Sequence, residues 1–565
     1  MNSIRKPELN SDNLVRTNVS EQQEISDGEC VDCLDLKKVF ISSPKLVVWS
    51  ALEEATRHQA KRQAQTKQTN KKEESKPKRF IWLLILGCIL IIAGILTLIW
   101  KPFDILMTER LKMMKGLPAY DWWQNPPDEV LLRAHVFNIT NGEEFMKGKA
   151  DKLIVQEVGP YIFREKLYHT NVIFNDNGTL TYTATRKLIY LPELNTLSLN
   201  DTVFVANLAI MGAASYLSNA PYVTKIAYNL FISRFGTKPF VRLSVNDYFW
   251  NFTDPLLEFG RSFAPSLVPE DNMGILNQIY KDFTDVVTVH MGVESGPRNF
   301  FKIDKYNGAN GLQAWSNETC DSVLGSSEGV SYHQNVFKND TVKYLRKTIC
   351  RALPLYYGGD VEMFGMTGYR FNLPNNTFSR SENENEECYS DPSYPLLPSG
   401  LSDVSPCYYN LPIASSFPHL MFAEPKATDK LQGLTPDWDR HGSAAIIEPN
   451  TGVPFTAWAR SQCNLIMHSM SGFPKLKRFS NTVIPMFWLE YKQMGLPGYI
   501  STLMYFSVVI LPSIQLYISL SLLIIGFIFY LISMVRLWKS VSYKRAKYSL
   551  IKLFNSTRIE TTEHV

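Results

Sequence analysis

The sequence predicts an α+β protein in which a mainly antiparallel β domain, interrupted by helices, lies between two membrane-spanning helices. Three observations lead to this prediction. Two uncharged apolar runs lie near the two ends of the chain, and short apolar runs separated by turn residues fill most of the region between them. Residues 203–235 have helical spacing instead. A domain of this size is large enough for a wide barrel or for two packed sheets.

The first apolar run, Phe80 to Trp100, has the length that a helix needs to cross a bilayer, with a tryptophan near each end. A cleaved signal peptide is the alternative, but such peptides begin a chain and have a shorter apolar core. The second run, Ile514 to Val535, is also uncharged. We therefore expect transmembrane helices at residues 80–100 and 513–536.

Basic residues gather on the terminal side of both runs, which predicts that both termini are cytosolic. Residues 1–79 form a cytosolic and largely disordered tail, residues 101–512 an extracellular or lumenal domain, and residues 537–565 a second cytosolic tail. The basic residues on these sides are Arg57, Lys61, Arg62, Lys67, Lys71, Lys72, Lys76, Lys78, Arg79, Arg536, Lys539, Lys544, Arg545, Lys547 and Lys552.

The formal net charge of +4 belongs to the tails, because acidic residues outnumber basic ones between the two runs. This distribution excludes nucleic acid as the partner of the large domain. It favours tails that rest against an anionic inner leaflet, although the same charge is explained equally well if it only fixes the topology.

Five of the eight cysteines lie in the C-terminal half of the external domain. An oxidising compartment pairs most of them, and the odd number leaves one free or intermolecular. The pair Cys30 and Cys33 has no second pair or histidine nearby, and the external histidines show no metal spacing, so we expect no metal. The five cysteines are Cys320, Cys350, Cys388, Cys407 and Cys463.

Seven sequons of the external domain predict N-linked glycans, whereas those at Asn18 and Asn555 fall in the cytosolic tails. The seven asparagines are Asn138, Asn177, Asn200, Asn251, Asn317, Asn339 and Asn375.

Along the external domain, residues 101–118 keep a helical pattern and predict a stalk that continues the first membrane helix. Helices are also expected over residues 203–235, where Pro221 opens a second piece, and over residues 245–259. Gly159-Pro160 is interpreted as a turn between two strands, and Asn177-Gly178 as the turn of a hairpin. Strands are expected at residues 131–139, 153–158, 161–168, 172–174 and 180–188, and again between residues 286 and 463.

An enzyme is the first alternative to a binding protein. Gly325-Ser326-Ser327-Glu328-Gly329 matches the pattern GxSxG, but a nucleophile elbow needs a buried strand before the serine and a helix after it. The preceding residues are polar and include a sequon, and no alternation of strands and helices surrounds them. We interpret the motif as a Gly/Ser turn and expect no catalytic residue and no cofactor.

Several motifs carry a resemblance to a known family. They include Val155-Gln156-Glu157-Val158-Gly159-Pro160-Tyr161-Ile162-Phe163-Arg164-Glu165, Asn125-Pro126-Pro127, Val245-Asn246-Asp247-Tyr248-Phe249-Trp250, Ile447-Glu448-Pro449-Asn450-Thr451-Gly452 and Val483-Ile484-Pro485-Met486-Phe487-Trp488. In these motifs, in their order and in its two apolar runs, the chain resembles the class B scavenger receptors. That family includes the fatty acid translocase, the lysosomal integral membrane protein and the insect sensory neuron membrane proteins.

The resemblance implies a β-barrel ectodomain with a helical bundle at its membrane-distal end and a hydrophobic tunnel toward the bilayer. Residues 203–235 match the bundle, and Arg234 and Lys238, with Lys225 as a weaker candidate, match the basic positions that engage acidic head groups. A cation beside an apolar opening holds a carboxylate or phosphate while the chain enters. The alternative is a solvated helix end, where cations are also favourable.

The resemblance also implies the bridge Cys350 to Cys407. Cys320 pairs with Cys388 in one branch of the family and with Cys463 in another, and we favour Cys388, which leaves Cys463 free. In the C-terminal tail, Tyr548-Ser549-Leu550-Ile551 fits a tyrosine-based sorting signal that an adaptor takes as an extended strand.

These expectations describe a two-span glycoprotein of the plasma membrane, or of the endosomal and lysosomal membrane, that captures amphipathic lipids at a helical apex and passes them to the bilayer. Its expected partners are lipids, lipoprotein-like particles and sorting adaptors, with homo-oligomers left open. The alternative is a receptor that recognises lipoproteins, apoptotic cells or microbes on its surface without passing lipid.

Overall fold

The computed structural model describes residues 80–560, apart from residues 111, 127–128, 264, 266–267, 269, 282, 293 and 382–387. The expectations for the N-terminal tail, including Cys30 and Cys33, lie outside the described residues. Residues 84–532 form one compact unit, and the described residues on either side of them, 80–83 and 533–560, belong to a second unit.

The strands are β1 (Val130–Ile139), β2 (Leu153–Phe174), β3 (Thr179–Tyr190), β4 (Thr202–Ala206), β5 (Phe240–Ser244), β6 (Thr284–His290), β7 (Ile303–Tyr306), β8 (Thr341–Arg346), β9 (Arg351–Met363), β10 (Met366–Asn372), β11 (Ser402–Asp403), β12 (Ile413–Ser416), β13 (Leu431–Gln432), β14 (Ala444–Ile447), β15 (Pro454–Met467) and β16 (Thr482–Gln493). The helices are Phe80–Trp100, α2 (Pro102–Arg110), α3 (Pro118–Gln124), α4 (Gly142–Met146), α5 (Leu208–Tyr216), α6 (Tyr222–Phe235), α7 (Val245–Trp250), α8 (Pro255–Phe263), α9 (Ile275–Tyr280), α10 (Glu318–Asp321), α11 (Pro425–Thr428), α12 (Trp438–His441), α13 (Gly498–Tyr505) and α14 (Leu511–Glu560).

One large sheet of 14 strands dominates the ectodomain, with the main order β7-β6-β3-β2-β1-β16-β15-β14-β10-β9-β8 and antiparallel neighbours along this path. The sheet is open, because its two edge strands, β7 and β8, do not pair with each other. The expected α+β class and the antiparallel sheet are confirmed, whereas the expected closed barrel is wrong.

The GxSxG segment explains why the sheet does not close. The backbone of Ser326 accepts a hydrogen bond from Ile303 N of β7 at 2.8 Å, and Gly325 N donates to Ile303 O at 3.0 Å. On its other side, Ser327 N donates to Lys343 O of β8 at 2.9 Å, and Leu345 N donates to Ser327 O at 2.8 Å. A short irregular segment thus pairs with part of the backbone of both edge strands, at Ile303 of β7 and at Lys343 and Leu345 of β8, and covers edges that would otherwise be exposed there.

Strand β2 corrects another expectation, since Gly159 and Pro160 lie inside one long strand and form no turn. The β1–β2 register passes from Ala134 opposite Tyr161 to Val136 opposite Val158, so these two residues sit at a bulge. Proline has no N–H to give to a ladder and is tolerated at bulges. The Asn177-Gly178 hairpin turn between β2 and β3 is confirmed.

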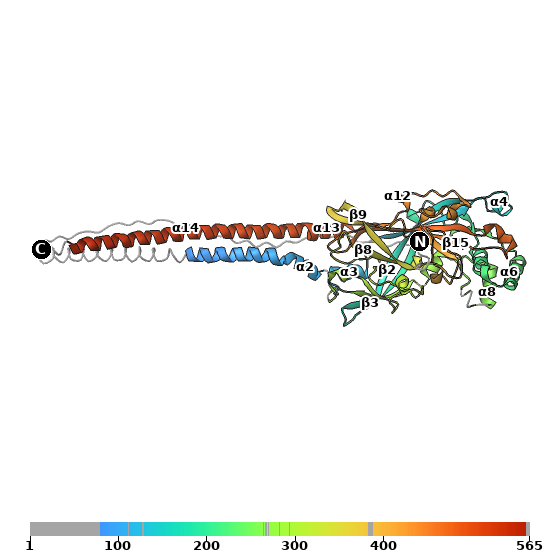
Figure 1. The fold of residues 1–565 in the computed structure, drawn as a ribbon, viewed down its shortest axis with the longest axis horizontal. Helices are drawn as coiled ribbons and strands as arrows, with labels where there is room; N and C mark the ends of the chain where they lie inside the picture. The colour runs from blue at the N-terminus through green and yellow to red at the C-terminus, as the bar shows by residue number, and fades with distance from the viewer. Residues whose placement is uncertain are drawn as a thin grey trace, which may run out of the picture. The chain divides into compact units, whose positions relative to one another are not determined.

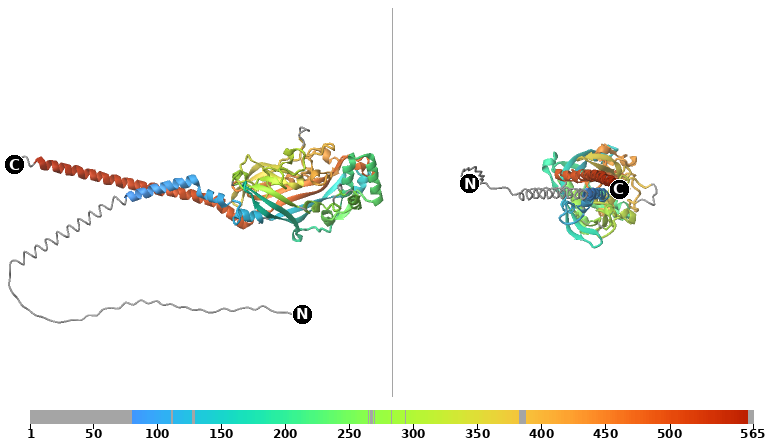
Figure 2. Two further views of the ribbon diagram at one scale, coloured as in Figure 1. Left: turned by 90° about the horizontal axis from the view of Figure 1, so that it is seen from below. Right: turned by 90° about the vertical axis from the view of Figure 1, so that its left-hand side faces the viewer.

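The helical insertion is divided more finely than its spacing suggests. Val203 lies in strand β4, which pairs with β5, while α5 and α6 carry the helical part. Figure 1 places α6 and α8 at one end of the ectodomain and α13 at the other, and the turned view of Figure 2 agrees. The ectodomain therefore has a helical apex opposite α13.

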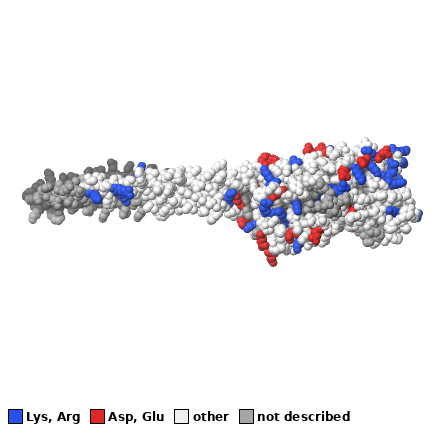
Figure 3. Space-filling model, viewed as in Figure 1, with Lys and Arg blue, Asp and Glu red and all other residues white. Residues whose placement is uncertain are grey.

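Two helices, Phe80–Trp100 and the helical run Gly498–Leu553, are long and apolar enough to cross a membrane. Part of the paired helices carries no charged residue in Figure 3. Gly87 and Gly526 pack backbone to backbone between them, and Ser519 donates a hydrogen bond to Thr97 at 2.8 Å. Such contacts suit helix pairs in lipid. The expected stalk is not continuous with the first helix, because the helix stops before Lys101, which has a positive φ of 44°.

Candidate functional site

Three cavities follow one another inside the ectodomain, and we call them apical, central and basal. The apical cavity is lined by residues of α5, α9 and the nearby strands. It shares the lining residue Ser461 with the central cavity. The central cavity shares Pro126, Val330 and Gln493 with the basal cavity, which α3 and α13 line. The shared residues make the three cavities neighbours, in a series from the apex toward the second membrane helix.

The central cavity has one apolar wall and one charged wall. Side chains of β9, β14 and β15 contribute to the apolar wall. Leu353 and Leu355 of β9 both face the cavity, because alternate residues of a strand face the same side. The charged wall contains Glu165, Arg186 and Glu328, which lie on three different segments of the chain. The interior is therefore amphipathic, unlike a purely apolar tunnel.

The charged wall is held by direct contacts. Arg186 donates to Glu165 Oε1 at 2.8 Å and lies 3.6 Å from Glu328. Tyr280 and Tyr491 each donate to Glu165 at 2.7 Å, so both oxygens of this carboxylate are occupied. A buried charge is tolerated when it is paired and hydrogen-bonded in this way.

At the apex, Arg234 and Lys238 are exposed beside the C-terminal end of α6. Among the residues that the structure describes, no carboxylate oxygen lies within 4.0 Å of either side chain. Lys225 differs, since its ammonium donates to the backbone oxygen of Ser218 and lies 6.0 Å from the ring of Phe473. Two of the three predicted cations are thus available to a ligand, and the third is turned inward.

An exposed apolar surface accompanies these cations. On α6, Val223 and Leu230 are 77% and 65% exposed, and Phe263 at the end of α8 is 76% exposed. Phe259 links the two helices, with ring centroids 4.6 Å from Phe231 and 4.4 Å from Phe263. Figure 3 shows Lys and Arg side chains gathered at the same end of the ectodomain. The apex therefore combines positive charge with apolar side chains, as a surface for amphipathic ligands does.

A cluster of histidines around Glu157 escaped the sequence analysis, because its members are far apart in the chain. His419 Nε2 lies 2.7 Å from Glu157 Oε2, and His135 Nδ1 lies 2.7 Å from Oε1. Burial alone raises the pKa of Glu157, but the hydrogen bonds from both histidines outweigh it and hold that pKa well below its usual range. The ring of His441 stacks on His419 with centroids 4.5 Å apart.

Glu157, His419 and His441 place one donor atom each within 4.8 Å of one another, close enough to hold a metal ion. The positions of the ring hydrogens on His419 and His441 argue against a metal ion here. Nδ1 of His419 accepts from Thr435 N and Nδ1 of His441 accepts from Asp437 N, both at 3.0 Å, so the neutral rings carry hydrogen on Nε2. A metal-binding histidine normally donates through its other nitrogen. The cluster fits a carboxylate held by histidine donors better than a metal site.

His441 gives the ectodomain a stability that acid removes. Burial first, and the neighbouring His419 second, lower the pKa of His441 to about 4. An unfolded histidine titrates near pH ~6.5, so below that pH the unfolded chain binds a proton that the folded chain does not. The contribution is complete above about pH 6.5 and falls by about 1.4 kcal/mol per pH unit as the pH approaches the folded-state pKa.

We expect His441→Asn to flatten this pH dependence. Asparagine keeps an oxygen that accepts from Asp437 N, but it cannot be protonated in this range. The thermal unfolding midpoint of the full-length protein, followed by tryptophan fluorescence between pH 7.5 and about 4.5, checks this. Wild-type and variant midpoints that fall in parallel would show that His441 does not carry the effect.

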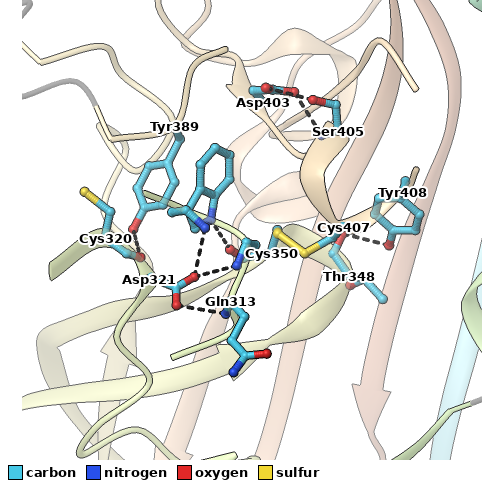
Figure 4. Close-up of a disulfide and its surroundings, with 12 residues drawn as sticks. Gln313, Cys320, Asp321, Thr348, Cys350, Tyr389, Asp403, Ser405, Cys407 and Tyr408 are labelled. Carbon is cyan, nitrogen blue, oxygen red and sulfur yellow. Dashed lines mark hydrogen bonds between the residues drawn. A yellow bond between two sulfur atoms is a disulfide. The ribbon is translucent and has the colours of Figure 1, made fainter. Parts of the chain in front are cut away.

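The predicted disulfides are confirmed. Cys320 pairs with Cys388 and Cys350 with Cys407, while Cys463 is free. Figure 4 shows the Cys350–Cys407 bridge, with Cys320, Asp321 and Tyr389 near it. The hydroxyl of Tyr389 donates to the backbone of Cys320 at 3.2 Å, and Asp321 accepts backbone N–H groups of the loop before it. The bridges thus fix the loops around the sheet.

The remaining predicted sites are placed as follows. Asn138 is half-buried, and its side-chain oxygen accepts from Phe204 N at 2.8 Å. The other six sequon asparagines of the ectodomain are exposed. Tyr548 and Ile551 are exposed on helix α14, so adaptor binding as an extended strand needs local unwinding of this helix. The glycans and the sorting signal stay predictions.

Ser327 of the GxSxG pattern is not built as a nucleophile. Its hydroxyl donates to the backbone oxygen of Ser331 and accepts from Gly329 N at 3.0 Å. The segment is a connector between the sheet edges rather than a strand-to-helix elbow.

Comparison with known proteins gives the same family that the motifs indicate. Scavenger receptor class B member 1 of Cricetulus griseus is 25% identical over 464 residues, covering 80% of this chain and 88% of that protein. The protein of the same name from Rattus norvegicus is 26% identical over 460 residues, with 80% and 88% covered. Lysosome membrane protein 2 of Homo sapiens is 26% identical over 413 residues, with 72% and 83% covered. Because the sequence profile of the CD36 family also matches residues 84–537, the chain belongs to the CD36 family, the family of class B scavenger receptors.

Proposed function

We propose that this scavenger receptor captures amphipathic lipids at its helical apex and passes them through the ectodomain to the membrane. The observation that carries the proposal is the series of three neighbouring cavities that share lining residues, which begins beside α5 and ends at α13. Apolar side chains dominate the apical and basal cavities, as a route for acyl chains requires. The apolar helices that precede and follow the ectodomain in the sequence then anchor it in one bilayer, with both termini of the chain cytosolic.

Surface recognition of lipoproteins, apoptotic cells or microbes is the second candidate. The apolar and basic surface of α6 and α8 favours it, because such a surface binds a particle without any internal route. The two candidates place the protein in the plasma membrane or, like the lysosome membrane protein among its relatives, in the lysosomal membrane. The two candidate functions differ in whether the bound lipid moves from the apex into the ectodomain.

We expect the double variant Arg234→Glu and Lys238→Glu to weaken capture of acidic lipids. Both cations are exposed, so charge reversal repels a carboxylate or phosphate during the encounter. We expect uptake to fall by about three- to tenfold and the loss to shrink as salt is raised, because exposed charges are screened beyond about 8 Å at physiological ionic strength. Binding and cellular uptake of fluorescent long-chain lipids with several head groups measure both effects.

A matched control is Lys305→Glu with Lys343→Glu, which makes the same change of charge at exposed positions of the sheet edges β7 and β8. If both double variants lose binding and uptake of acidic lipids equally, the effect comes from net charge, and Arg234 and Lys238 are not the capture site. A different outcome would leave surface recognition as the function. In it, the apex variant loses binding, but cells that display the protein never take up more lipid than cells that lack it.

A further inference from the structure

Arg346 differs from the other arginines that line the central cavity. Arg186 has two carboxylates nearby, as described above. Arg460 donates to Glu490 Oε1 at 2.7 Å and 2.9 Å and to the backbone oxygens of Asp439 and Gly442. Each of these guanidinium groups is therefore neutralised and hydrogen-bonded.

The guanidinium of Arg346 has far fewer partners. It lies at the end of β8, is 8% exposed, and faces the central cavity. Its Nη1 is 3.4 Å from the hydroxyl of Tyr344, and its carbon lies 4.7 Å from the ring centroid of Tyr491. Within the described ranges, no carboxylate oxygen approaches it within 4.0 Å.

A buried guanidinium carries five N–H donors in a fixed fork, and leaving them unused costs free energy. The same fork matches the two oxygens of a carboxylate or phosphate, and the pair is strongest away from bulk water. Because Arg346 lines the cavity, a ligand within the cavity can reach these donors. The same cavity is also lined by the apolar side chains of Ile349, Leu353 and Leu373.

We propose that Arg346 is an internal binding site for the oxyanion head group of a single-chain lipid, held midway along the cavities with its chain on the apolar wall. The inference rests on the proposed passage of lipid and deepens it. A lipid carboxylate or phosphate that has left the apex meets a second cation before the basal cavity. Neutral lipids of the same chain length gain nothing from this contact, so the central cavity selects for anionic single-chain lipids.

The test uses full-length protein in nanodiscs and three photoreactive 18-carbon probes that differ only in head group, namely carboxylate, phosphate and alcohol. Labelled peptides are identified by mass spectrometry, and labelling is measured against probe concentration. Arg346→Met removes the charge and keeps an unbranched side chain of similar length. Tyr344→Phe is the matched control, because it removes only the hydroxyl next to Arg346.

We expect labelling of residues that line the central cavity, and we expect Arg346→Met to weaken it about tenfold for the carboxylate probe, the phosphate probe or both, because hydrogen bonds to charged groups have this magnitude. The alcohol probe should change less than about twofold, as should all probes in Tyr344→Phe. If Arg346→Met weakens labelling by only one of the two anionic probes, the head group of that probe is the preferred one. Unchanged unfolding midpoints verify that Arg346→Met folds, and Arg346→Leu replaces it if they change.

Two results would overturn the internal site at Arg346 but not the passage of lipid. In one, Arg346→Met weakens all three probes equally, which assigns the loss to packing. In the other, the wild-type cavity is labelled and no probe responds to the substitution. Wild-type protein that is labelled nowhere along the cavities would instead overturn the passage of lipid itself, and the internal site with it.

Discussion

Replacement of Ser461 by tryptophan is expected to stop lipid transfer while leaving capture at the apex intact. Ser461 lies on β15 and is the residue that lines both the apical and the central cavity. A serine is small, whereas an indole fills space of the kind that an acyl chain needs. Because Ser461 borders two cavities, we expect the cost of overpacking to stay within about 1–3 kcal/mol.

The measurement separates binding from transfer. Fluorescent oleate is supplied to cells that display equal amounts of each variant, and surface-bound and internalised lipid are quantified. Ser461→Ala is the matched control, because it changes the same position without adding bulk. We expect internalised lipid to drop to the level of cells lacking the protein for the tryptophan variant only. Normal transfer by Ser461→Trp would exclude a route through these cavities and favour surface recognition.

Local patterns predicted the parts of the fold that depend on local physics. Hydropathy found both long apolar helices, since a bilayer demands an uninterrupted apolar stretch. The Asn177-Gly178 turn predicted its hairpin, because these residues favour the positive φ that such a turn needs. The disulfides came from the resemblance, and the pairing of Cys320 with Cys388 agrees with one of its two branches.

Features that depend on distant contacts could not be predicted in this way. Gly159-Pro160 is a turn signal by composition, but the bulge opposite His135 is visible only in the register of β1 and β2. Closure of the sheet depends on the loop between β7 and β8, and Gly325–Ser327 occupies the place where a pairing strand would lie. No local pattern reports that choice.

Some residues of the candidate site were predicted before the structure was known, and others were not. Arg234 and Lys238 came from the resemblance, which matches them to the basic positions of the helical bundle. Glu165, Arg186 and Arg346 were not predicted, since each comes from a different strand and only the curved sheet turns them into one cavity. Alternation along β8 does place Tyr344 and Arg346 on one face, but an arginine on a strand is ordinarily read as solvent-exposed.

Glu165→Ala is expected to destabilise the ectodomain by about 3–5 kcal/mol, the usual cost of removing one member of a buried ion pair. Its side chain is 1% exposed and accepts hydrogen bonds from Arg186, Tyr280 and Tyr491. Loss of the carboxylate leaves Glu328, at 3.6 Å, as the carboxylate nearest to Arg186, which otherwise donates only to the hydroxyl of Tyr491 among the described contacts. It also removes the acceptor of the hydroxyl groups of Tyr280 and Tyr491. The uncompensated charge, more than the lost volume, sets the size of the effect.

The neighbouring pair supplies the control for that argument. Glu129 accepts from Arg164 at 2.6 Å, but these side chains are 42% and 35% exposed, so water and salt replace the interaction when it is removed. Glu129→Ala should therefore cost less than about 1 kcal/mol. Unfolding of the full-length variants in detergent, with the disulfides intact, compares the two. Similar losses for Glu129→Ala and Glu165→Ala would mean that the central cavity is wet enough to screen Arg186, and a cavity of that kind would not favour the passage of an acyl chain.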